Sequence, residues 1–247
     1  MASLFANRVA VVTGAGSGIG QATALAYAAG GAKVIVSDIK ENDTVAKIKA
    51  NGGEATFIKT DVSKAAECEH LVKQTIDIYG KIDIAFNNAG ILGETNQLAE
   101  MSLAGFEKVI SVNLNGVFYC MKYEIDAMLK QGGGVIVNTA SILGAVGFMS
   151  FSGYVAAKHG VVGLTQNAAM EYSKKGIRIN CVAPGFINTP LLNDIDKAGK
   201  EALELKHPIG RLGTSEEVAA LVIWLSSSQA SFATGGYYPI DGGYLTA

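Results

Sequence analysis

The sequence predicts an α/β fold in which a single domain is built on a doubly wound parallel sheet with helices on both faces. Short β-branched segments such as RVAVVT (8–13) and KVIVSD (33–38) alternate along the chain with longer segments of helical pattern. This alternation favours parallel strands joined by right-handed crossovers. No repeat, linker or low-complexity segment interrupts the 247 residues, and α/β folds of about 250 residues often form one domain. We therefore expect residues 1–247 to form a single domain.

The composition argues against several classes of function. The formal net charge is −2 with no long run of one sign, so we expect no nucleic-acid or membrane partner. No apolar segment reaches the ~18 residues of a spanning helix, and the first residues, MASLFANR, do not resemble a secretory leader. The cysteines Cys68, Cys120 and Cys181 are scattered, which is typical of reduced thiols in a cytoplasmic protein. The three histidines are equally scattered, and we predict no metal site.

A glycine-rich loop follows the first predicted strand. The loop GAGSGIG (14–20) leads into a helix of small residues, QATALAYAAGG. Its glycines allow a sharp turn and a close approach to a pyrophosphate, and the N-terminus of the helix offers N–H groups to phosphate oxygens. The second predicted strand ends at Asp38, eighteen residues beyond Gly20. This spacing is close to the ~20 residues expected for an acid that binds the ribose 2′-hydroxyl of a dinucleotide.

Asp38 also bears on the choice between the two nicotinamide dinucleotides. A carboxylate repels a 2′-phosphate, and positions 15–17 of the glycine-rich loop are Ala, Gly and Ser, with no basic side chain. Lys40 is nearby and is the one residue that could receive such a phosphate. We predict NAD(H) over NADP(H). The alternative for Asp38 is that it caps the helix predicted within ENDTVAKIKA (41–50).

The next two strands end in polar residues at the same predicted edge of the sheet. The third strand, EATFIKTDV (54–62), ends with Asp61, which could also cap the helix that follows. The fourth, IDIAFNNAG (82–90), ends in two asparagines that can bond the main chain of a turn and in small residues that allow a ligand to pass closely. Residues 99–130 have a long helical pattern interrupted by Asn113, which competes for main-chain hydrogen bonds.

Ser141, Tyr154 and Lys158 form the most informative set of polar residues. The fifth predicted strand, VIVNTAS (135–141), places Ser141 at a carboxyl end, where open α/β sheets bind ligands. The loop ILGAVGFMSFSG (142–153) has four large apolar side chains, which is typical of a substrate pocket. Tyr154 and Lys158 are four residues apart and share a helical face. Because a nearby ammonium favours the phenolate, we expect Lys158 to lower the pKa of Tyr154. Alone, such a pair is more often a surface contact.

The remaining segments complete the sheet. IRINCVAPG (177–185) is the sixth predicted strand, and residues 191–210 form a helical insert. TSEEVAALVIWLSS (214–227) has the capping pattern of a helix that begins at one of its first two residues. YYPIDGGY (237–244) is the seventh predicted strand.

Taken in order, TGAGSGIG, Asp38, Asp61, NNAG, Asn113, Ser141, YVAAK and the PG…T segment resemble the motifs of the short-chain dehydrogenase/reductase family. The resemblance covers essentially the whole chain. It implies a Rossmann-type sheet of seven strands in the order 3-2-1-4-5-6-7 and hydride transfer to or from a nicotinamide dinucleotide. It also implies a homotetramer and a substrate lid at about residues 190–210.

The resemblance assigns a role to each matching residue. The catalytic residues would be Asn113, Ser141, Tyr154 and Lys158. The cofactor-binding residues would be Gly14, Ser17, Gly18, Ile19, Gly20, Asp38, Ile39, Asp61, Val62, Asn88, Ala89, Gly90, Tyr154, Lys158, Pro184, Gly185, Ile187 and Thr189. The substrate would contact Ser141, Leu143, Phe148, Tyr154 and Phe186. Two alternatives stay open: Asn113 could hold a relay water or serve only to shape its helix, and Thr189 with Pro190 could simply start a helix.

Three functions are compatible with these residues. The apolar pocket loops favour a neutral ketone or secondary alcohol, and hence a carbonyl reductase or alcohol dehydrogenase acting on aryl or alkyl ketones. The second function is a 3-oxoacyl-(acyl carrier protein) reductase, which needs a basic surface for its acidic carrier. The lysines that could form one, or could simply solvate helix ends, are Lys122, Lys130, Lys174 and Lys175. The third is a nucleotide-sensing binding protein without catalysis, although such proteins usually lose the catalytic tyrosine or lysine.

Overall fold

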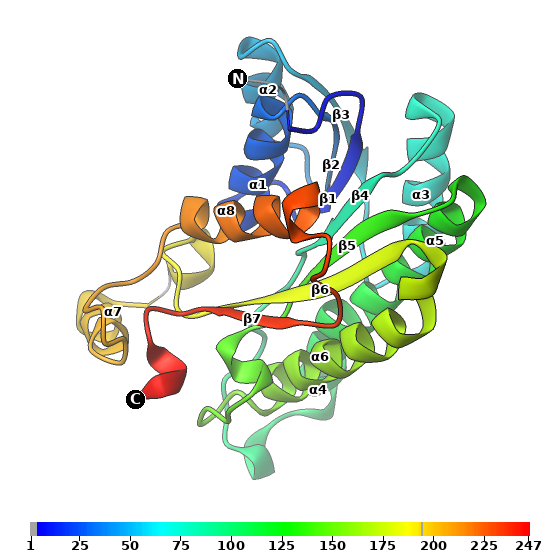
Figure 1. The fold of residues 1–247 in the computed structure, drawn as a ribbon. Helices are drawn as coiled ribbons and strands as arrows, with labels where there is room; N and C mark the ends of the chain where they lie inside the picture. The colour runs from blue at the N-terminus through cyan, green and yellow to red at the C-terminus, as the bar shows by residue number, and fades with distance from the viewer. Residues whose placement is uncertain (1–3, 194) are drawn as a thin grey trace.

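A seven-stranded parallel sheet forms the centre of the molecule (Figure 1). The computed structural model describes residues 4–193 and 195–247. The strands are β1 (Val9–Thr13), β2 (Lys33–Asp38), β3 (Glu54–Lys59), β4 (Ile84–Asn87), β5 (Gly134–Thr139), β6 (Ile177–Pro184) and β7 (Tyr237–Ile240). Their order is β3-β2-β1-β4-β5-β6-β7 and every neighbouring pair is parallel, which confirms the prediction.

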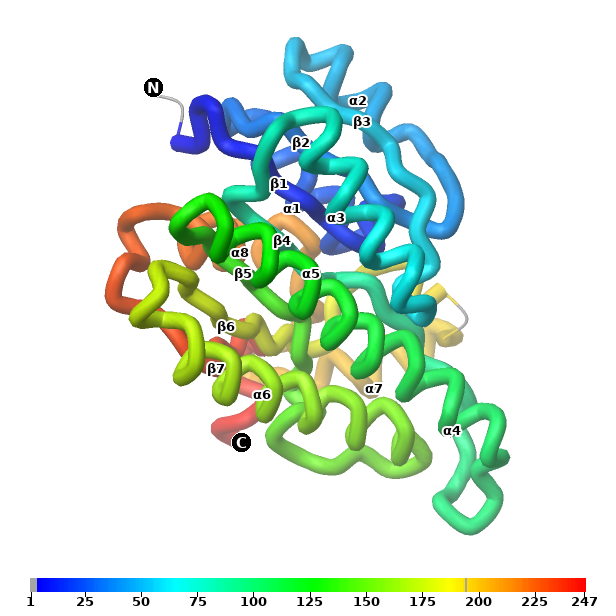
Figure 2. The backbone as a smooth tube through the Cα atoms, turned by 90° about the vertical axis from the view of Figure 1, so that its right-hand side faces the viewer, coloured from blue at the N-terminus to red at the C-terminus, as the bar shows by residue number. Residues whose placement is uncertain are grey.

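Helices cover both faces of this sheet. They are α1 (Gly18–Ala29), α2 (Thr44–Ala50), α3 (Ala65–Tyr79), α4 (Leu103–Ile110), α5 (Gly116–Gln131), α6 (Ser152–Tyr172), α7 (Lys197–Glu204) and α8 (Ser215–Ser226). Helices α1 and α8 pack together on one face, and α3, α5 and α6 cover the other. Figure 2 shows α3, α5 and α6 crossing the face of the sheet that is turned toward the viewer. The fold is therefore the doubly wound arrangement predicted from the alternation of strands and helices.

Strand β1 illustrates why its sequence is continuously apolar. All five of its residues are buried, and successive side chains of a strand point to opposite faces. Val11 belongs to the core beneath α3, α5 and α6, whereas Val12 belongs to the core beneath α1 and α8. A strand that is covered on both faces needs apolar residues at consecutive positions.

The order of the strands reverses between β3 and β4, and this reversal creates the ligand crevice. The chain leaves β3 at the edge of the sheet, passes through α3 and returns beside β1 as β4. The connections that follow β1 and β4 therefore diverge to opposite sides. Open α/β sheets bind ligands outside the carboxyl ends of the strands at such a point.

The helical pattern predicted over 99–130 is divided by one π-helical turn, Ser111–Asn115, between α4 and α5. At its centre the Asn113 side chain is fully buried and binds the main chain of Ile91. Nδ2 donates to the Ile91 carbonyl (2.8 Å), and Oδ1 accepts from the Ile91 N–H (2.9 Å). A side chain that bonds outside its own helix gives a physical reason for the widened turn.

The predicted lid, at about 190–210, contains a short 3-10 turn at Pro190–Leu192 followed by α7. Asp194, which falls within it, lies outside the described residues. Asp196 caps α7 by accepting a hydrogen bond from the Gly199 N–H (2.7 Å). The segment predicted as a lid therefore contains a short helix with a defined start, as its helical pattern predicted.

Some predicted boundaries shift by a few residues. The third strand ends at Lys59, and the seventh ends at Ile240. Gly242 and Gly243 have φ angles of 57° and 88°, which turn the chain away from the sheet. Helix α8 begins with a capping box in which Thr214, the first of the two predicted residues, is the cap.

Candidate active site

A large cavity opens at the carboxyl ends of the strands. Its volume is about 820 Å³, and it is lined by the glycine-rich loop, the segments that follow β2 to β6, and the lid. The cofactor-binding residues predicted from the sequence line it, except Gly20, and so do the predicted substrate contacts. Of the predicted catalytic residues, Ser141, Tyr154 and Lys158 line the cavity, whereas Asn113 lies behind its wall.

The glycine-rich loop forms one end of this cavity. Gly14 and Gly18 have φ angles of 61° and 52°, a region that other residues rarely adopt. Ser17 precedes α1 in an extended conformation, and the first N–H groups of a helix have no partners within it. Gly20 does not line the cavity, because it packs so closely that any side chain there would strike the Gly14 carbonyl. The close approach of Gly20 to Gly14 therefore closes the glycine-rich loop from behind.

Asp38 is held against the glycine-rich loop. Its Oδ2 accepts a hydrogen bond from the Gly16 N–H (2.9 Å), and its Oδ1 accepts one from the Ile39 N–H (2.7 Å). The alternative role as a helix cap does not fit, because α2 begins only at Thr44. Lys40 is exposed and does not line the cavity.

Thr13 ties the Asn-Asn-Ala-Gly segment to the glycine-rich loop. Thr13 Oγ1 accepts hydrogen bonds from the main-chain N–H groups of Asn88 (3.0 Å) and Ala89 (3.2 Å). In return, Asn88 Nδ2 donates to the carbonyls of Thr13 (3.1 Å) and Gly14 (3.2 Å). These bonds join the carboxyl ends of β1 and β4. Asn88, Ala89 and Gly90 therefore form one surface with the glycine-rich loop.

Asp61 and Val62 line the cavity after β3. Asp61 Oδ1 accepts hydrogen bonds from the Ser63 hydroxyl (2.6 Å) and the Ser63 N–H (3.1 Å). The Ser63 hydroxyl lowers the pKa of Asp61 by stabilising its ionised form. Helix α3 begins at Ala65 after Lys64, so Asp61 shapes the turn before the helix without being its cap.

Ser141 and Tyr154 meet where β5 ends and α6 begins. The Ser141 hydroxyl accepts a hydrogen bond from the Leu143 N–H (3.1 Å) and lies close enough to the Tyr154 hydroxyl to influence its pKa. The Ser141 carbonyl accepts a hydrogen bond from the Tyr237 hydroxyl (2.9 Å). The serine is therefore fixed from both sides while it lines the cavity together with Tyr154.

The pKa of Tyr154 is shifted in the direction opposite to the one we expected. Burial raises it to about 12, and the nearby Ser141 hydroxyl offsets only part of this effect. Lys158 Nζ lies 5.5 Å from the Tyr154 ring centre and donates to the Thr139 carbonyl (2.6 Å). Burial lowers the pKa of Lys158 to about 8. Burial disfavours both the phenolate form of Tyr154 and the ammonium form of Lys158. The four-residue spacing of these residues does not indicate how deeply either one is buried.

Asn113 acts on the cavity through Ile91. The two hydrogen bonds described above engage both polar groups of its side chain, and Ile91 lines the cavity. This arrangement matches the structural role that the sequence left open. The relay water implied by the resemblance stays a prediction.

The segment after β6 continues the wall toward the lid. The Gly185 N–H donates to the Ile240 carbonyl (3.1 Å), and Ile187 forms an isolated parallel bridge with Gly213. Thr189 lies close to Gly18 and precedes the turn that begins the lid. The Thr-Pro pair thus both lines the cavity and starts a helical turn.

Several cavity residues were missed by reasoning from the sequence. Thr139 holds Lys158 through its carbonyl, and a main-chain group is not tied to any residue type. Ile91 and Leu92, after the Asn-Asn-Ala-Gly segment, and Leu203 of the lid also line the cavity. Their apolar side chains look like any others in the sequence. Thr13 does not line the cavity but holds the Asn-Asn-Ala-Gly segment beside it, and it is the detectable case because it directly precedes the glycine-rich loop.

Comparison with known proteins extends over the whole chain. A family model described as enoyl-(acyl carrier protein) reductase matches residues 14–245. Cyclohexanol dehydrogenase of Acinetobacter sp. (strain SE19) is 52% identical over 249 residues, covering 100% of this chain and 98% of that protein. Cis-4-hydroxycyclohexanecarboxylate dehydrogenase of Sinomonas cyclohexanicum is 42% identical over 246 residues, covering 99% of each. The crystal structure of a short-chain type dehydrogenase/reductase from Mycobacterium marinum superposes with a TM-score of 0.95 at 36% identity, covering 100% of this chain and 98% of that one. With the fold and the order of its motifs, these matches establish that the chain belongs to the short-chain dehydrogenase/reductase family of oxidoreductases.

Proposed function

We propose that this chain interconverts a secondary alcohol and a ketone with NAD(H) as the hydride carrier. The observation that carries the proposal is that Ser141, Tyr154 and Lys158 line the same cavity as the glycine-rich loop and Asp38. Its volume of about 820 Å³ is within the range typical of ligand sites. The glycine-rich loop, the start of α1 and Asp38 fit a dinucleotide, and a bound nicotinamide ring would supply or accept the hydride.

The polar residues of the chain divide the remaining work. Ser141 and Tyr154 bind the substrate oxygen together and so orient the reacting carbon. Tyr154 gives its proton to that oxygen during reduction and takes it back during oxidation. With a pKa of about 12, Tyr154 is protonated at neutral pH and is ready as the acid. Lys158, held by the Thr139 carbonyl, has a pKa of about 8 and supplies positive charge near the phenol at and below neutral pH.

Asp38 supports NAD(H) over NADP(H). Among the described residues, the charged side chains on the cavity wall are those of Asp38, Asp61, Lys108 and Lys158. Neither lysine belongs to β2 or to the loop after it, where the ribose 2′-position would lie beside Asp38. A 2′-phosphate would therefore meet the Asp38 carboxylate, whereas Lys40, the cation of that loop, is exposed and does not line the cavity. We expect a lower KM for NADH than for NADPH, and the reverse order would contradict this choice.

The wall beyond Tyr154 supports a neutral, compact substrate. Its side chains are mainly apolar and aromatic, and include Leu92, Leu143, Phe148, Phe186 and Leu203. Two relatives are named for alcohols that carry the hydroxyl on a cyclohexane ring. We therefore propose alicyclic ketones and alcohols as the first substrates to examine, followed by aryl and alkyl ketones.

The test is a screen of NADH oxidation with cyclohexanone, acetophenone and 2-octanone, and of NAD⁺ reduction with the matching alcohols. We expect turnover with at least one ketone and its alcohol. NADH binding, measured by fluorescence, without turnover of any pair would favour the nucleotide-sensing protein over the enzyme.

The description of the matching family model keeps an acyl carrier protein substrate as a second candidate. Three of the four lysines that could form its basic surface do not support it. Lys130 ends α5 just before β5, and Lys174 and Lys175 precede β6, so they lie at the amino ends of strands, opposite the cavity. Lys130 is also paired with Asp126 (2.7 Å). The test compares kcat/KM for a 3-oxoacyl group attached to the acyl carrier protein with kcat/KM for the same group attached to a small thiol. It distinguishes a carrier-dependent reductase from an enzyme that acts on free ketones. A kcat/KM at least tenfold higher on the carrier would favour this candidate.

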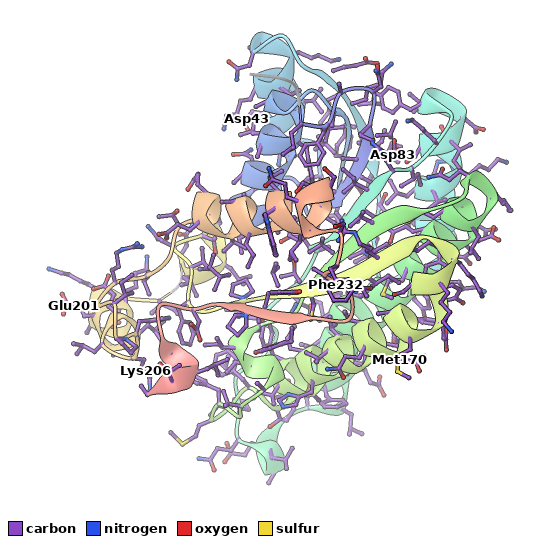
Figure 3. All side chains as sticks on the ribbon, viewed as in Figure 1. Asp43, Asp83, Met170, Glu201, Lys206 and Phe232 are labelled. Carbon is purple, nitrogen blue, oxygen red and sulfur yellow. The ribbon has the colours of Figure 1, made fainter. Side chains whose placement is uncertain are left out.

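We also propose a cytoplasmic homotetramer. Large apolar side chains are exposed on several helices, among them Leu103 on α4 and Phe118 on α5. Met170, at the end of α6, and Phe232, before β7, are almost fully exposed (Figure 3).

Within the described ranges, none of the helices combines the length and apolarity needed to span a bilayer. Light scattering of the purified chain tests the tetramer, and a monomer at micromolar concentration would contradict it.

A further inference from the structure

His207 is a buried histidine behind the substrate side of the cavity. It lies between α7 and α8 and is 3% exposed. Its Nδ1 is 2.8 Å from the Leu203 carbonyl, and its Nε2 is 3.2 Å from the Phe186 main-chain nitrogen. Leu203 and Phe186 both line the cavity. The imidazole therefore joins the end of the lid helix to the loop after β6.

The two partners determine the form of the imidazole. The Leu203 carbonyl can only accept a hydrogen bond, so Nδ1 carries the proton and donates it. The Phe186 N–H can only donate, so Nε2 is an unprotonated acceptor. His207 is thus neutral, with both ring nitrogens engaged by main-chain groups. If the ring were protonated on both nitrogens, its Nε2–H group would face the Phe186 N–H, and two donors cannot form a hydrogen bond.

Ring contacts extend this connection to two more segments. The His207 ring lies 5.7 Å from Phe186 at 87° and 5.6 Å from Tyr244 near the C-terminus. Phe186 in turn contacts Phe148, from the loop after β5, with ring centres 5.6 Å apart. Gly185 makes room for this arrangement, since a Cβ there would lie 2.8 Å from Nε2. Segments from four parts of the chain therefore converge on this imidazole and its neighbour.

We propose that His207 is a positioning residue that couples the lid to the loop after β6 and thereby sets the affinity for the ketone or alcohol. The identity of that ligand rests on the function proposed above. Without the imidazole nitrogens, the Phe186 N–H would lose its acceptor behind an apolar wall, which is more costly than a missing contact at the surface. The Leu203 carbonyl would keep the hydrogen bond from the Lys206 N–H (3.2 Å). The glycine-rich loop and Asp38, which would hold most of a dinucleotide, are outside this cluster, whereas Gly185 and Ile187 flank Phe186. We therefore expect a smaller effect on nucleotide binding than on ketone binding.

Two substitutions separate the hydrogen bonds from the packing. His207→Phe keeps a ring but has no nitrogen, and His207→Gln provides one acceptor and one donor in a side chain of similar reach. We expect H207F to raise the KM for cyclohexanone about tenfold, equivalent to about 1.4 kcal/mol, with the Kd for NADH changed less than twofold. H207Q should recover most of this loss. The matched control is His70→Phe, because His70 is exposed on α3. A ketone KM for H207F within twofold of wild type, or an equal rise in the NADH Kd, would overturn the proposal.

Two measurements do not depend on turnover. Limited trypsin digestion should cleave the H207F lid at Lys197, Lys200 or Lys206 at least fivefold faster than the wild-type lid, and H207Q should be intermediate. Nitrogen NMR of the wild-type imidazole should show a proton on Nδ1 and none on Nε2 at neutral pH. Equal cleavage rates in folded variants, or a proton on Nε2, would contradict the role of His207. Absence of ketone turnover in the wild type, with both of these results as expected, would instead refute the proposed function and leave the lid connection standing.

Discussion

Replacement of Glu124 by glutamine should change how the stability of the protein depends on pH. Glu124 lies on α5 and is 1% exposed. Its Oε2 accepts a hydrogen bond from Asn87 Nδ2 (2.9 Å), and the same nitrogen donates to Asn138 Oδ1 (3.1 Å). Among the described residues, Glu124 forms no ion pair, and the buried Asn87 Oδ1 has no hydrogen-bond partner. A protonated Glu124 carboxyl suits this site better than a carboxylate, because its O–H group is a hydrogen-bond donor and the buried Asn87 Oδ1 has no donor of its own.

The direction of the effect follows from the raised pKa of this carboxyl. Burial raises the pKa of Glu124 from 4.5 to about 7, and the Asn87 hydrogen bond offsets only part of that effect. The folded protein therefore holds the proton more tightly than the unfolded chain does. The resulting stability is complete below about pH 4.5 and is lost progressively as the pH rises to about 7. The gap between these two pKa values corresponds to ~3 kcal/mol, at roughly 1.4 kcal/mol for each pH unit.

Glu124→Gln removes the titration while keeping a carbonyl oxygen for Asn87 and an N–H group for the unpaired amide oxygen. We expect the free energy of unfolding of the variant to gain roughly 2–3 kcal/mol relative to wild type between pH 5 and pH 8. Urea denaturation at several pH values measures this difference, and Glu69→Gln on the exposed side of α3 is the control. The reasoning is refuted if the difference between Glu124→Gln and wild type stays constant across that range.

Three further predictions concern the cavity. Tyr154→Phe should reduce turnover by at least a thousandfold while the Kd for NADH stays within about twofold, because the phenol moves the proton but leaves the glycine-rich loop intact; retention of full activity would end its role as the acid and base. Asp38→Ala should lower the KM for NADPH about tenfold or more relative to that for NADH, since the carboxylate no longer repels a 2′-phosphate; an unchanged ratio of the two KM values would mean that Asp38 does not select the cofactor. Asn113→Ala should lower the free energy of unfolding by roughly 1–3 kcal/mol, because it leaves both main-chain groups of Ile91 without their partners; chemical denaturation measures it, and a loss of activity with unchanged stability would favour the relay-water role instead.

Much of the fold could be predicted because its causes are local. The continuous apolar run of VAVVT reports a strand buried on both faces, and its alternation with helical segments determines a parallel sheet with a known crossover hand. The glycines at 14 and 18 mark positions of positive φ that other residues rarely occupy. Tyr154 and Lys158 share a face through the period of the helix alone. Each of these inferences needs only a few consecutive residues.

The four-residue spacing of Tyr154 and Lys158 could not predict whether the pKa of Tyr154 is raised or lowered. That direction depends on burial, and burial depends on segments from distant parts of the chain that pack around the phenol. The hydrogen bonds between Asn113 and Ile91 join residues 22 positions apart, and the contact between His207 and Phe186 spans 21. The Thr139 carbonyl that holds Lys158 is a main-chain group, which any residue would provide.

For this protein, the sequence by itself determined the alternation of strands and helices, the glycine-rich loop and the presence of a tyrosine, a lysine and a serine at one edge of the sheet, and its motifs implied the order of the strands through the family they resemble. Only the tertiary structure decided which charges the interior disfavours and which main-chain groups hold the site in place. The physical reason is that backbone preferences act over a few residues, whereas desolvation and long-range hydrogen bonds arise when distant segments exclude water from the space between them.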